Sequence, residues 1–271
     1  MTIVEQTPGR TARHAIEDVE AAERGARWRW RGTFAVVWLG LILGLGIGLY
    51  ATGRIDPAFI ADVGPFILEG APITLLVCVL SITAATALAI IGALGRLSDN
   101  PILNAIASFY VSVIRGTPLI VQILFWYLAL PQFGIVLDAL HAGIGALAFN
   151  YGAYMTEIFR AGIEAVPRGQ REAARAIGMT ESQVMRRVVF PQALRIVTPA
   201  IGNEFIAMIK DSALVYLIGV REVLWRADVM GTRFFRSVET LLIAAVVYWI
   251  LTIVLSYFQA RLERRMARGD R

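Results

Sequence analysis

The sequence contains few of the residues that form disulfides, metal clusters and charged surfaces. It has one cysteine, two histidines and one lysine, and only 17% of its 271 residues are charged. The single cysteine, Cys78, excludes a disulfide within the chain, and His14 and His141 are too far apart for the spacing of a Cys/His metal cluster. The charged fraction lies below the ~25% of soluble globular proteins. These shortages argue against a water-soluble domain.

Apolar residues dominate instead, at 57% of the chain, which is more than a body of this size hides from water. About 20 apolar helical residues cross the ~30 Å hydrocarbon core of a bilayer. The sequence contains six such runs, and polar residues interrupt some of them, including the third and the fifth. We therefore predict an all-α membrane protein with about six transmembrane helices, approximately at residues 32–52, 72–94, 104–130, 142–163, 196–218 and 240–258.

The first run is predicted to be a retained helix rather than a cleaved signal peptide. Acidic residues precede it, it is long, and no Ala-x-Ala cleavage site follows. The polar residues 1–31 before it are predicted to form a cytoplasmic tail, solvated or in contact with the lipid surface.

The placement of the arginines predicts the orientation. Arginines gather before the first run, after the second, between the fourth and fifth, and after the sixth. In a six-helix arrangement these segments share one face, which the positive-inside bias makes cytoplasmic together with both termini. The connection 220–237 departs from this trend with four arginines. We interpret it as a short surface helix and loop whose arginines lie at lipid headgroups or face a partner, and we infer that the basic surplus does not indicate nucleic-acid binding.

The polar segment from Pro167 to Pro191 is predicted to form two short helices. Pro167 suits the start of the first helix, and Gly178 suits the left-handed residue that ends it. Thr180 and Gln183 have the spacing of a capping box at the start of the second helix, which Pro191 is expected to end. The same outline is compatible with a DNA-binding helix-turn-helix or with a plain cytoplasmic hairpin.

Four motifs in order resemble one family. The segment from Glu172-Ala173-Ala174 through Gly178 to Pro191 resembles the EAA loop of ABC-importer permeases. Three further segments resemble the polar amino acid (histidine/glutamine/glutamate/arginine) uptake permeases of that class: Arg115–Pro118 with Gln122, Tyr151–Arg160 and Asn203–Ser212. The resemblance runs from about residue 70 to the C-terminus and implies a type I importer permease fold in a bacterial inner membrane. It divides the chain into a tail (1–31), an additional helix and extracytoplasmic loop (32–66), a type-1 transmembrane domain (67–262) and a C-terminal tail (263–271).

The resemblance also implies partners. An ATPase subunit dimer would bind ATP and Mg²⁺, a second permease subunit would complete the pathway, and an extracytoplasmic binding protein would deliver the amino acid. The chain itself would bind no cofactor and catalyse no reaction. In agreement, the sequence has no glycine-rich phosphate loop ending in Gly-Lys-Ser/Thr. The residues that the resemblance assigns to coupling with the ATPase are Glu172, Ala173, Ala174, Gly178 and Pro191.

Polar residues within apolar runs are costly and usually face a bundle interior or a water-filled cavity. Positions 203 and 210, and likewise 204 and 211, are seven apart and share a helix face. We predict as candidates for the substrate path Arg115, Thr117, Gln122, Glu157, Asn203, Glu204, Lys210 and Asp211. A structural interpretation remains open for some of them: Glu157 with Arg160 as an ion pair, Lys210 with Asp211 as a local pair, and Arg115 as a scaffold residue.

A second class of function uses the same carboxylates differently. A stand-alone ion-coupled carrier or a membrane-embedded enzyme could use Glu157, Glu204 or Asp211 to handle protons. No histidine lies within a run, and no nucleophile-base spacing accompanies these carboxylates. These observations favour the importer.

The glycine turn offers a direct test. We expect Gly178→Val to abolish ATP-driven uptake or assembly, because a β-branched residue is a genuine outlier at positive φ. Uptake by membrane vesicles and co-purification of the ATPase measure the two effects. Intact uptake and assembly in this variant would show that the loop has been assigned wrongly.

Overall fold

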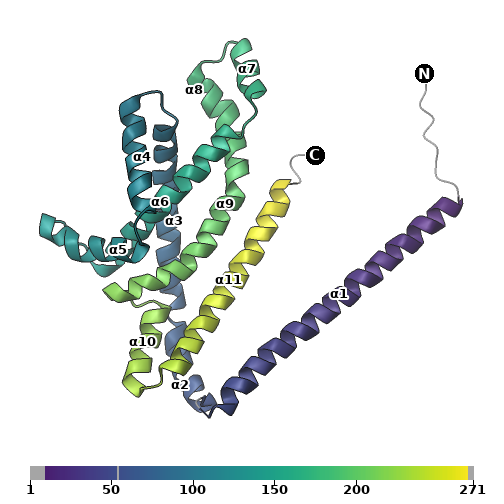
Figure 1. The fold of residues 1–271 in the computed structure, drawn as a ribbon, viewed down its shortest axis with the longest axis vertical. Helices are drawn as coiled ribbons and strands as arrows, with labels where there is room; N and C mark the ends of the chain where they lie inside the picture. Colours follow the sequence, from purple (N-terminus) through teal and green to yellow (C-terminus); the bar gives the residue numbers. More distant parts are fainter. Residues whose placement is uncertain (1–9, 54, 268–271) are drawn as a thin grey trace. The chain divides into compact units, whose positions relative to one another are not determined.

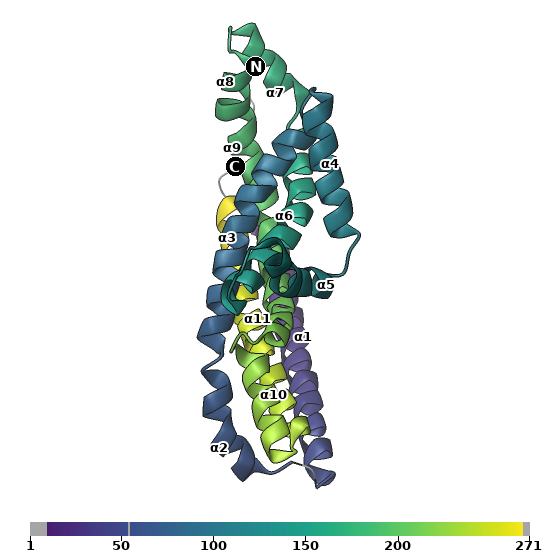
Figure 2. The same ribbon diagram turned by 90° about the vertical axis from the view of Figure 1, so that its left-hand side faces the viewer.

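The computed structural model describes residues 10–53 and 55–267, and every regular element in these ranges is a helix. The chain divides into two units between Asp56 and Pro57. The predicted all-α class is confirmed (Figures 1 and 2).

The first unit contains one long helix, α1 (Arg10–Ala51). Its part from Gly25 to Ala51 is long and apolar enough to cross a membrane, in agreement with the first predicted span. Ring centroids lie 5.2 Å apart for Trp30 and Phe34 and 5.9 Å apart for Phe34 and Trp38, so aromatic side chains follow one face at successive turns. α1 also includes residues 10–31 of the predicted tail, whereas residues 1–9 lie outside the described part.

The second unit begins with α2 (Pro57–Leu68) and α3 (Ala71–Arg96). α3 contains the second predicted span, and α2 forms a helix inside the predicted extracytoplasmic connection. Gly70 separates the two helices and lies against the backbone of Glu222 and Val223. A Cβ atom added to Gly70 would stand 2.5 Å from the Val223 nitrogen. This close approach requires glycine.

The third predicted span, 104–130, is a bent pair of helices rather than one helix. α4 (Pro101–Arg115) is followed by α5 (Leu119–Leu124), a π-helical turn η1 (Phe125–Ala129) and a 3₁₀ turn η2 (Leu130–Phe133). The bend between the two parts is 106°. Its cause is Pro118, which has extended backbone and no N–H to continue the helix.

The buried side chain of Gln122 pairs the backbone groups that this bend frees. Its Nε2 donates to the Ile114 oxygen at 2.8 Å, the Thr117 oxygen at 3.2 Å and the Thr117 Oγ1 at 2.9 Å. Its Oε1 accepts from Asn150 Nδ2 at 3.2 Å. A bend at membrane depth needs such internal partners because hydrocarbon offers none.

The fourth predicted span corresponds to α6 (Ala139–Glu164), which contacts α3, α4, α5 and α9. Leu147, Met155 and Phe159 of α6 belong to the main hydrophobic core. The Asp138 side chain caps the helix by accepting from the His141 backbone N–H at 3.0 Å. α6 is therefore the central helix of the unit, as both views show (Figures 1 and 2).

The two helices predicted between residues 167 and 191 are present, but the second does not end at Pro191. α7 (Arg168–Ala176) and α8 (Glu181–Val184) are followed by the π-helical turn η3 (Met185–Val189) and then by α9 (Phe190–Asp211). The helix thus runs on through Pro191. The Phe190 N–H donates to the Met185 oxygen, five residues back, and this wider turn accommodates a residue that lacks an N–H and would crowd a normal turn.

The same arrangement precedes Pro131. There the Leu130 N–H donates to the Phe125 oxygen across η1. In both cases the π-helical turn ends two residues before the proline. The pattern explains why neither proline stops the chain from coiling.

The fifth predicted span, 196–218, consists of the end of α9 and a 3₁₀ segment, η4 (Ser212–Ile218). α10 (Val223–Phe234) and α11 (Ser237–Ala267) follow, and α11 contains the sixth predicted span. Both views place α7 and α8 at one end of the second unit and α2 and α10 at the other (Figures 1 and 2).

α10 is the short helix predicted in the connection 220–237. The arginines of this connection, which were predicted to meet lipid headgroups or a partner, contact other residues of the chain. Val223 and Ala227 of α10 are buried in a cluster with residues of α2 and α11. The four arginines of the connection make two kinds of contact. Two form ion pairs, Arg226 with Glu69 at 2.7 Å and Arg236 with Glu239 at 2.5 Å, and two lie over aromatic rings, Arg221 over Trp225 and Arg233 over Phe234.

Within the described residues, three segments are long and apolar enough to cross a membrane: 25–51, 57–96 and 237–266. The bent pair of α4 and α5 adds a fourth if it counts as one span. The six-span arrangement stays a prediction.

The role of Gln122 can be tested by stability. We expect Gln122→Leu to lower the free energy of unfolding by about 1–3 kcal/mol, because it removes the hydrogen-bond partner of the buried Asn150 side chain and a donor to the Ile114 and Thr117 oxygens. Thermal unfolding of the purified protein in detergent measures this. Gln170→Leu, at an exposed position of α7, is the control, and equal effects of the two changes would contradict the role.

Candidate functional site

The turn between α7 and α8 has the geometry that its sequence predicts. Gly178 has a φ of +84°, and its N–H donates to the Arg175 oxygen at 2.9 Å. The Met179 N–H donates to the Ala174 oxygen at 3.1 Å. Thr180 and Gln183 form the capping box at the start of α8. The left-handed glycine and the capping box are both confirmed.

α7 packs on α8 and η3 through one side only. Ala174 is buried in a cluster that includes Ile163, Val184 and Val189, whereas Glu172 and Ala173 are exposed. Of the two small residues predicted to meet a partner, only Ala173 therefore faces outward. Ala174 serves the packing of the hairpin.

Ile177 is a surface residue that the sequence analysis missed. It directly precedes the glycine turn, and 75% of it is exposed. Contiguous exposed apolar groups mark contact surfaces, and Ile177 and the exposed Ala173 lie one helical turn apart on this hairpin. The signal was available in the sequence as an apolar residue between two helices rich in charge.

An ion pair links the two helices of the hairpin. Arg175 Nε donates to Glu181 Oε1 at 2.6 Å, and its Nη2 donates to Oε2 at 2.9 Å. The guanidinium lowers the pKa of the Glu181 carboxyl below its ordinary value. Both side chains are exposed, so the pair orients the turn more than it stabilises the fold.

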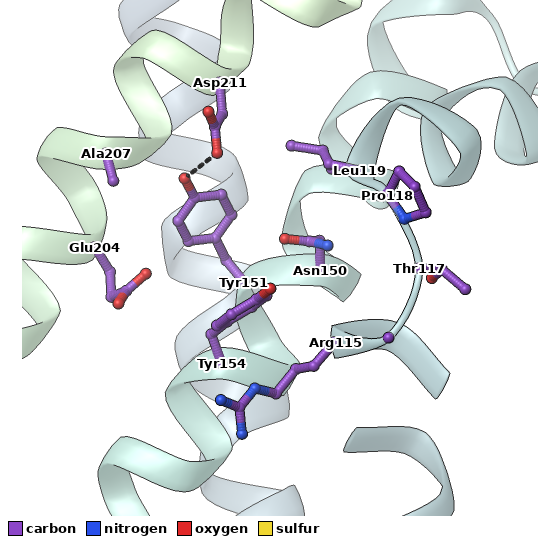
Figure 3. A pocket seen from close by; sticks show the side chains of 11 residues that line it. Arg115, Thr117, Pro118, Leu119, Asn150, Tyr151, Tyr154, Glu204, Ala207 and Asp211 are labelled. Carbon is purple, nitrogen blue, oxygen red and sulfur yellow. Dashed lines mark hydrogen bonds between the residues drawn. The ribbon is translucent and has the colours of Figure 1, made fainter. Parts of the chain in front are cut away.

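The second candidate site is a pocket of about 580 Å³ at the bend between α4 and α5. α6 and α9 supply its other walls, and Figure 3 shows the lining side chains on these elements. Its polar and charged lining residues are Arg115, Thr117, Asn150, Tyr151, Tyr154, Glu204 and Asp211. The pocket exists because Pro118 turns α5 away from the axis of α4.

The charged groups of the pocket differ in their partners. Arg115 lies over the Tyr154 ring, with its guanidinium carbon 5.1 Å from the ring centroid. Asp211 accepts a hydrogen bond from the Tyr151 hydroxyl at 2.7 Å, drawn in Figure 3. Glu204 is half-buried and forms no hydrogen bond or ion pair with the described residues. Neither Arg115 nor Glu204 thus forms an ion pair in the described part of the chain.

Comparison with known proteins identifies the family. Residues 81–268 match the model of the binding-protein-dependent transport system inner membrane component. The chain belongs to this family. It is therefore a membrane-spanning ABC-transporter permease, as the resemblance predicted.

Its curated relatives include two amino-acid transporters. The chain is 40% identical over 207 residues to the arginine transport system permease protein ArtQ of Bacillus subtilis (strain 168), covering 76% of this chain and 94% of that protein. It is 37% identical over 204 residues to the glutamine transport system permease protein GlnP of Escherichia coli (strain K12), covering 74% and 93%.

Solved structures agree. A crystal structure of an amino acid ABC transporter with histidines is 41% identical with a TM-score of 0.73, covering 78% of this chain and 99% of that chain. An inward-facing MetNI methionine ABC transporter, at 18% identity, has a TM-score of 0.64 over the same shares. The second likeness concerns the fold, which is the predicted type I importer permease fold.

Of the eight path candidates, the permease brings four together in the pocket: Arg115, Thr117, Glu204 and Asp211. The shared face of positions 204 and 211 is confirmed. The other four lie elsewhere. Gln122 is engaged in the bend, and Asn203 accepts from Gln259 of α11 at 2.9 Å.

Lys210 and Glu157 are the remaining two. Lys210 is exposed and does not line the pocket, and Asp211 binds Tyr151 instead of pairing with it. Glu157 pairs with Arg160 at 2.9 Å and with Arg96 at 3.1 Å. The prediction that Glu157 and Arg160 form a structural ion pair is therefore confirmed.

The buried and exposed alanines of α7 form a matched pair. We expect Ala174→Leu to lower the free energy of unfolding by about 1–3 kcal/mol through overpacking, and Ala173→Leu to change it by at most about 0.5 kcal/mol. Thermal unfolding in detergent compares them. A similar loss in both variants would show that the two positions do not differ in burial.

Proposed function

We propose that this permease carries polar amino acids through the pocket between α4, α6 and α9. The observation that carries the proposal is the pocket itself, which holds opposite charges without mutual pairing. An amino acid presents a carboxylate and an ammonium group, and it supplies the missing partners of both signs. The names of the relatives, which transport arginine and glutamine, support an amino-acid substrate over a stand-alone carrier or an enzyme.

The charges of the pocket assign roles to its side chains. Arg115 would bind the α-carboxylate, because a guanidinium presents paired donors that match a carboxylate. Glu204 would bind a cationic group of the substrate. The pocket has two carboxylates, Glu204 and Asp211, against one guanidinium. This balance favours polar amino acids with a cationic side chain over acidic ones.

Energy would come from a separate ATPase dimer that binds ATP and Mg²⁺. The exposed part of the α7–α8 hairpin, with Glu172, Ala173 and Ile177, is the surface that we assign to the ATPase. A second permease subunit and an extracytoplasmic binding protein would complete the importer. With this assignment the hairpin and both termini lie in the cytoplasm, and α2 and α10 lie at the outer end.

The route of coupling is one nearly continuous helix. α8, η3 and α9 run without interruption from Glu181 in the hairpin to Asp211 in the pocket. From Glu181 to Glu204 this is ~35 Å at 1.5 Å per residue. Movement of the hairpin would displace the pocket carboxylates directly. A ligand shifts such an equilibrium only through its different affinity for the two states.

Replacing the unpaired carboxylate tests the pocket. We expect Glu204→Gln to reduce kcat/KM for uptake of cationic amino acids by about tenfold, the effect of losing one charged hydrogen bond. The measurement is uptake of labelled arginine, lysine, histidine, glutamine and glutamate by proteoliposomes that contain the complete importer.

Asn203→Ala, at the neighbouring position outside the pocket, should leave uptake within about twofold of the native rate. If the native importer takes up none of these amino acids, the transport proposal fails. If it does, and Glu204→Gln changes nothing, the pocket is not on the path.

A further inference from the structure

A fully buried carboxyl group lies outside the pocket. Glu222 directly precedes α10, near the end of the unit opposite the hairpin, and none of its surface is exposed. It belongs to neither the pocket nor the α7–α8 hairpin. A buried carboxyl group is costly unless its oxygens are well paired.

Glu222 joins three helices through its two oxygens. Oε1 accepts from the Trp225 N–H at 2.8 Å and so caps α10. Oε2 accepts from the Thr74 hydroxyl of α3 at 3.3 Å and from the Tyr248 hydroxyl of α11. The Val223 N–H in turn donates to Thr74 Oγ1 at 3.5 Å.

No cation accompanies this carboxyl group among the described residues. Its neighbours Arg221 and Arg226 turn to other partners, the Trp225 ring and Glu69. Glu222 is therefore held by neutral donors only. Gly70 also lies in close contact with the backbone of Glu222 and Val223. Hydrogen bonds and backbone packing therefore both hold the start of α10 against the start of α3.

The short segment η4 connects this junction to the pocket. It begins directly after Asp211, which lines the pocket, and contacts α5 and α6, which supply other pocket walls. Gly219, with a φ of +90°, ends it just before the junction. η4 thus begins at the end of α9, and residues 219–221 connect its other end to Glu222.

We propose that Glu222 is a positioning residue for transport, which fixes the outer end of η4 so that this segment closes the pocket toward the outside. This inference rests on the proposed function, because it assumes that α9 moves during transport. With the junction intact, movement of α9 changes the path of η4. With the junction broken, η4 follows α9 and the outer closure loosens.

The test compares two variants of Glu222 in the complete importer, reconstituted in nanodiscs. Glu222→Leu keeps the volume and removes every hydrogen bond. Glu222→Gln keeps the volume and its oxygen accepts from Trp225, while the hydroxyls of Thr74 and Tyr248 rotate to accept from its amide. The readout is the ratio of ATPase activity without the loaded binding protein to activity with it.

We expect Glu222→Leu to raise this ratio about tenfold, because it removes all the hydrogen bonds with which Glu222 favours the closed state. Glu222→Gln should stay within about twofold of native, and Tyr248→Phe, which loses one donor, should raise the ratio by about threefold. Tyr248→Phe also preserves the test if Glu222→Leu does not assemble.

Glu239→Leu is the matched control. It removes another buried carboxyl group at the same end, paired with Arg236 rather than with α3. It should lower stability without raising the ratio. An unchanged ratio in both Glu222→Leu and Tyr248→Phe, or an equal rise in Glu239→Leu, overturns the inference. Failure of the native importer to couple ATP hydrolysis to uptake would instead overturn the proposed function.

Discussion

The pairing of backbone groups at the α4–α5 bend is the constraint on which the rest of the permease depends. A chain that turns by 106° inside a bilayer exposes carbonyl groups that lipid does not satisfy. Gln122 meets this need and also binds Asn150, so the bend is fixed to the central helix α6. With the bend fixed, Arg115 and Thr117 come to face Glu204 and Asp211 across one pocket. The polar groups of the site are thus placed by a residue that does not line it.

At two other prolines the helix continues without a bend, although proline lacks an N–H there as well. Pro131 and Pro191 each follow a π-helical turn, which shifts the hydrogen-bond register before the residue that lacks an N–H. At Pro191 the result is a helix that continues from the hairpin to the pocket. At Pro118 no such turn precedes the proline, and the chain breaks. A π-helical turn thus accompanies continuity at Pro131 and Pro191, whereas Pro65 and Pro199 lie inside helices without one.

The sequence correctly predicted the features that depend on residues close together in the chain. The capping box of Thr180 and Gln183, the left-handed Gly178 and the shared face of positions 204 and 211 depend on a few adjacent residues or on helical periodicity. The end of a helix at Pro191 was predicted wrongly, because a π-helical turn leaves no evident mark in the residues that form it.

Long-range contacts account for the other differences. Nothing local distinguishes Glu204, which faces α6, from Asn203, which turns to α11. Tyr151 became a site residue only through its bond to Asp211, 60 positions away. The intramembrane polar residues could be found from the sequence, but their division between pocket and scaffold depends on which helices pack together.

The unbroken run from Glu181 to Asp211 also has a thermodynamic consequence for an importer assembled as proposed. Two binding events that act on the same rigid element are linked, and the linkage is reciprocal. If binding of the ATPase to the hairpin changes the affinity for substrate by some factor, bound substrate changes the affinity for the ATPase by the same factor. Substrate bound at the carboxylates of Glu204 and Asp211 would then change the affinity of the hairpin for the ATPase at the other side of the membrane.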